Sequence, residues 1–166
     1  MAIGEPLRRH EDVVSSVAVS SDGQRVVFCS FDKTIRTCSV RTGKEVIDPL
    51  RGHDEIVTSV AVSRNNQRIV SGSYDRTVRV WDMSHGKQVR EPLCGHQGKV
   101  YLVAVSDDCR VIASASLNNA VRAWNASQEE VVQTDLGAHT NTVLCAALNE
   151  EGSRVVSRSL DRTVRL

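Results

Sequence analysis

Aromatic residues and charge of one sign are both scarce in this sequence. Only 4% of the 166 residues are Phe, Trp or Tyr, and the formal net charge at pH 7 is +1. A surface that stacks nucleic-acid bases needs aromatic rings, and one that holds phosphates or an anionic membrane needs a basic field. The composition therefore predicts neither a nucleic-acid partner nor a membrane partner.

Long apolar runs and paired cysteine motifs are also missing. No stretch approaches the roughly 20 apolar residues of a membrane-spanning helix, and the N-terminus, MAIGEPLRRH, lacks the apolar core of a signal peptide. The five cysteines include no C-x-x-C pair and occupy different positions of the repeat described below. We therefore expect reduced thiols in a cytoplasmic or nuclear protein, with neither a metal nor another cofactor.

What the sequence does contain is a repeat that fills it. Four histidines recur at intervals of 43 residues: His10, His53, His96 and His139. The repeats span 10–52, 53–95, 96–138 and, incompletely, 139–166. A period of roughly 40–45 residues that opens on Gly-His and closes on Trp-Asp is typical of a propeller blade. The whole chain, 1–166, is predicted to be a single repeat domain.

Each repeat is predicted to form four short antiparallel strands. In the second repeat these strands span 56–62, 67–71, 77–81 and 88–93, with turn residues between them. Short strands at this spacing indicate an all-β array. The first strand is apolar or small on both faces, which suits packing between neighbouring sheets. The fourth carries charge and proline, which suits an outer edge.

These residues closely resemble the WD40 family, and the resemblance covers the whole chain in four copies in phase. It implies a WD40 β-propeller of four antiparallel, four-stranded blades. The blades would form a partial or four-bladed ring, or half of a larger ring. The phrase Glu-Pro-Leu-x-Gly-His at 91–96 also resembles the repeats of fungal multi-repeat WD40 proteins, which often follow nucleotide-binding switch domains.

The family's blades share a polar network of a histidine, a serine, an aspartate and a tryptophan, which this sequence carries unevenly. Only the second repeat has all four, and in the first repeat Phe28 and Cys38 replace the serine and the tryptophan. The network residues implied by the resemblance are His10 and Asp32; His53, Ser71, Asp75 and Trp81; His96, Ser114, Asn118 and Trp124; His139, Ser157 and Asp161. Because losing one member leaves buried partners unpaired, the first blade is expected to be the least rigid.

The serine, histidine and aspartate of a repeat could also be interpreted as a hydrolase triad. The same set recurs at one period, whereas an active site does not, and no strand-turn-helix elbow exposes a nucleophile. The four histidines lie on different blades without a second ligand at metal-binding spacing. A structural role is favoured, so the chain is predicted to have no catalytic residues and no metal site.

The resemblance implies that partners dock on the rim that carries the histidine loops and aspartate turns, which we call the top rim. Two aromatic residues and two leucines occupy the four equivalent turn tips, with basic residues beside them, and such residue types are favoured in binding hot spots. The predicted partner-binding residues are Phe31, Tyr74, Leu117, Leu160, Arg76, Lys99 and Tyr101. In the alternative interpretation, the Phe and Leu tips only pack on the neighbouring blade.

The predicted function is a non-catalytic scaffold that binds partner proteins or peptides on the top rim. The alternative is a truncated structural fragment of a longer WD40 protein, such as a nucleotide-binding switch protein. Residues 4–9 are in phase with the outer strands of the later repeats, so we expect them to supply the outer strand that closes the last blade. Since rings of this family mostly have seven or eight blades, a homodimer that completes an eight-bladed ring is a further hypothesis.

Overall fold

The computed structural model describes residues 6–126 and 133–166, which form strands and turns without a helix. The first two repeats contain β1 (Val14–Val19), β2 (Arg25–Ser30), β3 (Ile35–Ser39), β4 (Val57–Val62), β5 (Arg68–Ser73) and β6 (Val78–Asp82). The last two contain β7 (Val100–Val105), β8 (Val111–Ser116), β9 (Ala120–Asn125), β10 (Gln133–Ala138), β11 (Val143–Leu148), β12 (Val155–Ser159) and β13 (Val164–Arg165).

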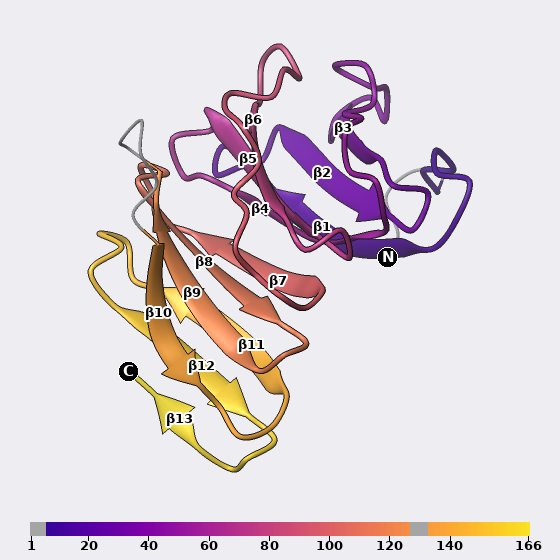
Figure 1. Ribbon diagram of the computed structural model, residues 1–166. Coiled ribbons are helices and arrows are strands. Elements are labelled where there is room, and N and C mark those ends of the chain that lie inside the picture. Colours follow the sequence, from indigo (N-terminus) through magenta and orange to yellow (C-terminus); the bar gives the residue numbers. More distant parts are fainter. Residues whose placement is uncertain (1–5, 127–132) are drawn as a thin grey trace.

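Each repeat forms one antiparallel sheet, and we number these sheets as blades one to four in chain order (Figure 1). Consecutive strands are neighbours, so the orders are β1-β2-β3, β4-β5-β6, β7-β8-β9-β10 and β11-β12-β13. The first three strands of repeat two agree with the predicted ranges to within two residues at every end. The prediction of an all-β array of antiparallel sheets is confirmed.

The prediction of four strands in every blade is not confirmed. Among the described residues, only blade three has a fourth strand, β10. In blades one and two the outer segment makes isolated bridges instead: Ile35 with Leu50, Cys38 with Glu45, Val78 with Leu93 and Trp81 with Gln88. Pro49 and Pro92 interrupt these segments. Because proline has no N–H to donate, it breaks a continuous ladder but is tolerated at an outer edge.

Every first strand is irregular at the same point, where the pairing with the second strand skips one residue. The skipped residues are Ser15, Thr58, Tyr101 and Leu144. A β-bulge re-aims the side chain of its extra residue. Three of these side chains donate a hydroxyl hydrogen bond to the next blade: Ser15 Oγ to Val57 O at 2.5 Å, Thr58 Oγ1 to Val100 O at 2.8 Å, and the Tyr101 hydroxyl to Val143 O.

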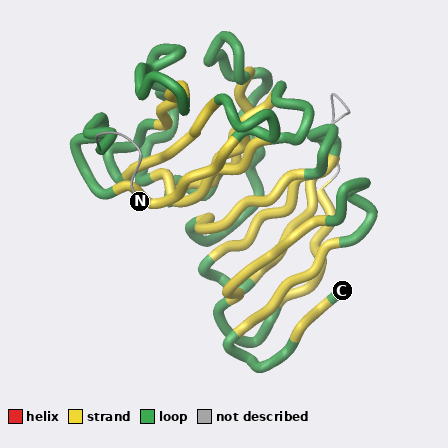
Figure 2. The backbone as a smooth tube through the Cα atoms, turned by 180° about the vertical axis from the view of Figure 1, so that it is seen from behind, coloured by secondary structure: helices red, strands yellow, loops and turns green. Residues whose placement is uncertain are grey.

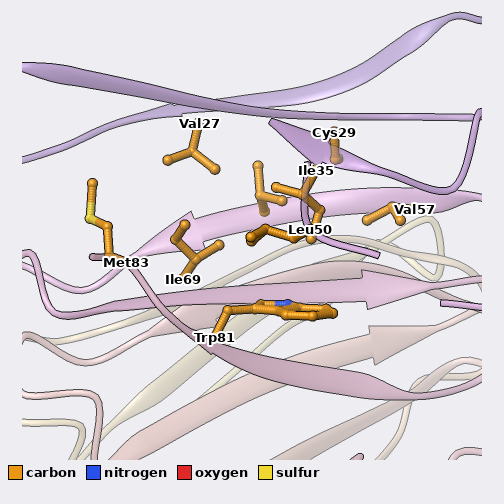
Figure 3. Close-up of a cluster of buried hydrophobic side chains, with 9 residues drawn as sticks. Val27, Cys29, Ile35, Leu50, Val57, Ile69, Trp81 and Met83 are labelled. Carbon is orange, nitrogen blue, oxygen red and sulfur yellow. The ribbon is translucent and has the colours of Figure 1, made fainter. Parts of the chain in front are cut away.

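The apolar core lies between blades rather than within them. In the first cluster, Val27, Ile35 and Leu50 of blade one face side chains of blade two (Figure 3). Those side chains are Val57, Val60, Ile69, Trp81 and Met83. A second cluster joins blades two and three in the same way, and a smaller one joins blades three and four. A blade therefore buries its apolar faces only when it has neighbours.

The two end blades leave one face uncovered each. Figures 1 and 2 show the array as an open arc, with blades one and four at opposite ends. Among the described residues, β13 pairs with β12 alone. Closure of the last blade by residues 4–9 of the same chain is therefore not seen; residues 4 and 5 lie outside the described part. The first strand, predicted to be packed on both faces, has one open face in blade one, where Val17 is 62% exposed.

Candidate functional site

The turn between the second and third strands has the same construction in every blade. Its last residue donates its N–H to the carbonyl of the serine three positions earlier: Lys33 to Ser30, Arg76 to Ser73, Asn119 to Ser116 and Arg162 to Ser159. The φ angles of these four residues lie between 66° and 71°. A tight turn followed by a left-handed residue is a common hairpin connection. The turn brings the preceding residue, Asp or Asn, next to the histidine loop.

The four predicted network residues of blade two are in hydrogen-bond contact. His53 Nδ1 lies 2.7 Å from Asp75 Oδ2, and His53 Nε2 lies 2.8 Å from Ser71 Oγ. Trp81 Nε1 donates to the same serine oxygen at 2.9 Å. The indole can only donate, so the serine hydroxyl donates onward to Nε2, and the imidazole donates from Nδ1 to the carboxylate. This chain of donors leaves no buried polar atom of the set unpaired.

A threonine also belongs to the network, although it was not among the network residues predicted from the sequence. Thr77 Oγ1 donates to Asp75 Oδ1 at 2.7 Å, and Thr34 and Thr163 make the same contact with their aspartates at 2.6 Å. The signal was present in the sequence as a threonine two residues after the aspartate in three of the four repeats. Blade three has Ala120 there and Asn118 in place of the aspartate, so the carboxylate and its hydroxyl donor are absent together.

The other blades retain parts of the arrangement. In blade one, His10 Nδ1 lies 2.8 Å from Asp32, and its Nε2 lies 3.3 Å from the backbone oxygen of Phe28. A backbone carbonyl thus lies opposite Nε2 where blade two has the serine hydroxyl, but the carbonyl can only accept a hydrogen bond, whereas the serine donates one. In blades three and four the histidine Nε2 contacts the predicted serine: His96 with Ser114 at 2.6 Å and His139 with Ser157 at 2.9 Å. His139 Nδ1 contacts Asp161 at 2.8 Å, and Trp124 Nε1 donates to Ser114 at 2.7 Å.

The network keeps its aspartates ionised. Burial opposes ionisation of Asp75, but the hydrogen bond from His53 and its favourable electrostatic interaction, together with the Thr77 hydroxyl, hold the pKa of Asp75 well below the usual value. Burial also opposes ionisation of Asp32, yet hydrogen bonds from Thr34 and the Glu11 amide lower its pKa to about 2. The carboxylates therefore act as acceptors that fix the turn and the histidine loop to each other.

Chemically, the set has the connectivity of a hydrolase triad but not its accessibility. Ser71 and Ser114 are fully buried, and each accepts a hydrogen bond from a buried tryptophan. A nucleophile must reach a substrate carbonyl, and these oxygens are enclosed by the strand and the indole. This arrangement supports a structural role for the Ser, His and Asp sets.

The turn tips lie next to the network, and most carry an exposed apolar side chain. Phe31, Leu117 and Leu160 are 36%, 47% and 55% exposed. Tyr74 is half-buried, with Lys99 Nζ 4.5 Å from its ring centre. All four tip amides donate at 2.9 Å to the loop before the first strand, at Val13, Ile56, Lys99 and Thr142. The tips are therefore held in place by the backbone.

Two of the predicted partner-binding residues differ in their surroundings. Arg76 is exposed at the turn, whereas Tyr101 is half-buried and donates its hydroxyl to the next blade. Burial and the nearby Cys145 thiol raise the pKa of Tyr101 to about 12, so the hydroxyl keeps its proton. The packing role of Tyr101 was not evident from the sequence, because its column holds a serine and a threonine in the earlier repeats.

All five cysteines are free, and burial raises the pKa of Cys29 and Cys109 to about 11. In the part of the chain that the structure describes, no group of His, Cys, Asp and Glu side chains is arranged to hold a metal ion. Nor does any helix within 6–126 or 133–166 have the length and apolar character needed to cross a membrane.

Comparison with known proteins adds one finding. The family model described as "WD40: WD domain, G-beta repeat" matches residues 4–37, 44–82, 86–125 and 129–166. The second and third matches begin in or near the outer segment of one blade and end on the last residue of the third strand of the next, and the fourth match ends one residue after β13. No curated protein matches the chain significantly.

Proposed function

Because the chain belongs to the WD40 repeat family, we propose that it is a non-catalytic scaffold that binds another protein or a peptide on its top rim. WD40 repeats in general mediate protein–protein interaction, and their domains are generally non-catalytic scaffolds. The partner is recognised by side chains at the turn tips of several blades. The polar networks hold the tips in place and take no part in chemistry.

The observation that carries this proposal is the set of exposed side chains on rigid turns. The tips share one construction but present an exposed phenylalanine, a half-buried tyrosine and two exposed leucines: Phe31, Tyr74, Leu117 and Leu160. Because the tip amides are already hydrogen-bonded, little backbone freedom remains to be lost on binding. Aromatic and apolar anchors of this kind are common centres of binding energy.

The basic residues after the aspartates support the same conclusion. Lys33, Arg76 and Arg162 have φ angles of 69°, 71° and 67°, a region that non-glycine residues rarely adopt. Glycine or asparagine would fit these positions with less strain, and blade three does have Asn119. Strained residues concentrate at functional sites. Arg76 and Arg162 are exposed, and they are available to pair with acidic groups of a partner.

The test uses a displayed library of random peptides selected on the unmodified chain. The rim variant combines Leu117→Ser with Leu160→Ser, and the control combines Val46→Ser with Val89→Ser at comparably exposed outer positions. We expect selected peptides to bind the rim variant at least about tenfold more weakly, because two anchors are removed. Binding to the control should be unchanged by calorimetry. Peptides that bind both variants equally well would refute the assignment of the top rim.

A further inference from the structure

The top rim contains three junctions, where the turn tip of one blade meets the loop before the first strand of the next blade. At the first junction, Lys33 Nζ of blade one donates to a backbone oxygen of blade two at 2.6 Å. At the second, Lys99 Nζ of blade three lies 4.5 Å from the centre of the Tyr74 ring of blade two. At the third, the His139 amide of blade four donates to Asn119 O of blade three at 3.1 Å. Both sides of each junction belong to this chain, so the three can be compared directly.

The junctions differ in charge beyond the network aspartates. At the first, the loop residues Asp54 and Glu55 are exposed beside Lys33, so two acidic side chains oppose one cation. At the third, the corresponding tip and loop residues carry no charge. The second has Arg76 at the tip and Lys99 in the loop, both exposed, and its loop has no acidic residue. The second junction is therefore the most positively charged of the three.

The two cations of the second junction are not neutralised by a neighbouring carboxylate. In the part of the chain that the structure describes, the side chains of Arg76 and Lys99 form no ion pair. Asp75 precedes Arg76 in the sequence, but its carboxylate oxygens contact His53 and Thr77, each at 2.7 Å. The charge of Asp75 is therefore used within blade two, and both cations are available to a ligand.

An apolar side chain lies beside these cations. The Leu117 amide donates to Lys99 O at 2.9 Å, and the Leu117 side chain is 47% exposed. The Lys99 ammonium lies over the half-buried Tyr74 ring. An ammonium has three N–H donors, and one ring face does not use all of them. A ligand that fits this place combines a negative group for the cations with an apolar group for Leu117.

Blade three adds neutral donors where the other blades have acidic residues. Gln97 and Asn118 are exposed, and among the described residues their side-chain amides make no hydrogen bond. A Cβ on Gly98 would lie 2.8 Å from Ser116 Oγ and 3.1 Å from Asn118 Cβ. An acidic side chain, which blades one and two carry at this position, therefore does not fit here. The close contact of loop and turn keeps the second junction free of negative charge.

We propose that the second junction binds a carboxylate of the partner, from an aspartate or glutamate that is next to a large apolar residue in the partner's sequence. The carboxylate pairs with Arg76 and Lys99, and the apolar side chain packs on Leu117. This inference rests on the proposed function, because it names the chemistry of the segment that the top rim binds. The acidic loop of the first junction repels such a segment and so directs it to blades two and three.

The first test compares two selections from a displayed library of random peptides. One uses the unmodified chain, and the other uses a chain with reversed charge, Arg76→Glu with Lys99→Glu. The unmodified chain should select Asp or Glu beside a large apolar residue, and the reversed chain should select Lys or Arg at the same place. Selection of peptides without a preferred charge, or of the same acidic peptides on both chains, would overturn the carboxylate site.

The second test measures the affinity of the selected peptides by calorimetry. Arg76→Gln with Lys99→Gln should weaken binding about tenfold, because two exposed charge pairs are lost. Replacing the peptide's acidic residue by its amide should weaken binding to the unmodified chain equally, but should add little when both cations are already gone. The control, Arg41→Gln with Lys87→Gln, removes two exposed charges beyond the opposite ends of the third strands and should leave the affinity unchanged. All four residues are exposed, so circular dichroism should be the same for every variant.

The results separate this inference from the proposed function. Peptides that are weakened by Leu117→Ser with Leu160→Ser, but not by Arg76→Gln with Lys99→Gln, would overturn the carboxylate site and leave the top rim as the binding surface. Peptides that are weakened by neither pair of substitutions would overturn both. Affinity that falls with the two cations and with rising salt supports the carboxylate site, since salt screens exposed charge pairs.

Discussion

Blade two has Ser71 and Trp81 where blade one has Phe28 and Cys38, yet both blades form the same three-stranded sheet. In blade two the indole fills the interface with blade one and donates to the serine. In blade one the histidine uses the Phe28 carbonyl, and its ring lies edge-on to the Phe28 ring at 5.1 Å. The comparison shows that the backbone of a blade tolerates loss of the side-chain network when a main-chain acceptor and an aromatic contact replace it.

The largest difference between the blades is expected at the tryptophan position. Trp81→Cys, which copies blade one into blade two, should reduce the free energy of unfolding by about 3–4 kcal/mol, since it opens a cavity between two blades. Cys38→Ala removes much less buried volume and should cost about 1 kcal/mol. Urea unfolding of both variants measures the difference. Equal losses would show that Trp81 does not support the interface more than Cys38 does.

Replacing a histidine should reveal a smaller difference in stability between blades one and two than replacing the tryptophan does. His53→Ala, like Asp75→Ala, leaves buried partners unpaired and should cost about 1–3 kcal/mol. His10→Ala should cost less, because the partner on its Nε2 side is a backbone oxygen at 3.3 Å rather than a serine. The denaturant midpoints of the His53→Ala and His10→Ala variants measure these two losses of stability. A His53→Ala midpoint equal to that of the unmodified chain would exclude a stabilising role for the network.

Acid should destabilise blades one and two through the same groups. Because the folded state lowers the pKa of Asp32 and Asp75, the unfolded state binds more protons in acid. The stabilisation is complete above the unfolded pKa of about 4 and is lost as pH falls towards about 2 and below. Asp75→Asn should therefore flatten the pH dependence of unfolding between about pH 4 and pH 2. An unchanged slope in acid titrations followed by fluorescence would argue against this.

The smallest effect is expected at Thr37, whose hydroxyl is buried without a hydrogen-bond partner among the described residues. Blade two has Val80 at this position, and valine has nearly the same shape. Thr37→Val should therefore stabilise the chain by about 1 kcal/mol. Thr34→Val is the matched control and should destabilise it, because Thr34 donates to Asp32. Thermal unfolding that shows both changes with the same sign would contradict the assignment.

Much of the fold could be predicted from the sequence, since the repeat compares four versions of one blade. The strand positions in repeat two and the grouping of His53, Ser71 and Asp75 follow from residues that recur in phase. Thr77 could have been added from the same comparison. The outer strands could not be placed as well, because Pro49 and Pro92 weaken a ladder by an amount that depends on the backbone around them. The bulge that turns Tyr101 towards the next blade could not be predicted, because it occurs in all four repeats and so does not change the length of any one of them.

By itself, the sequence determined the period of 43, the all-β class and the residues of the polar network. These follow from short-range chemistry: turn residues, apolar strands and the pairing needs of buried polar groups. The tertiary structure alone decided which apolar residues are buried. Val17 and Val60 occupy equivalent positions, but only Val60 has a neighbouring blade against it. Burial depends on what packs across an interface, and identical local sequence cannot specify whether that neighbour is present.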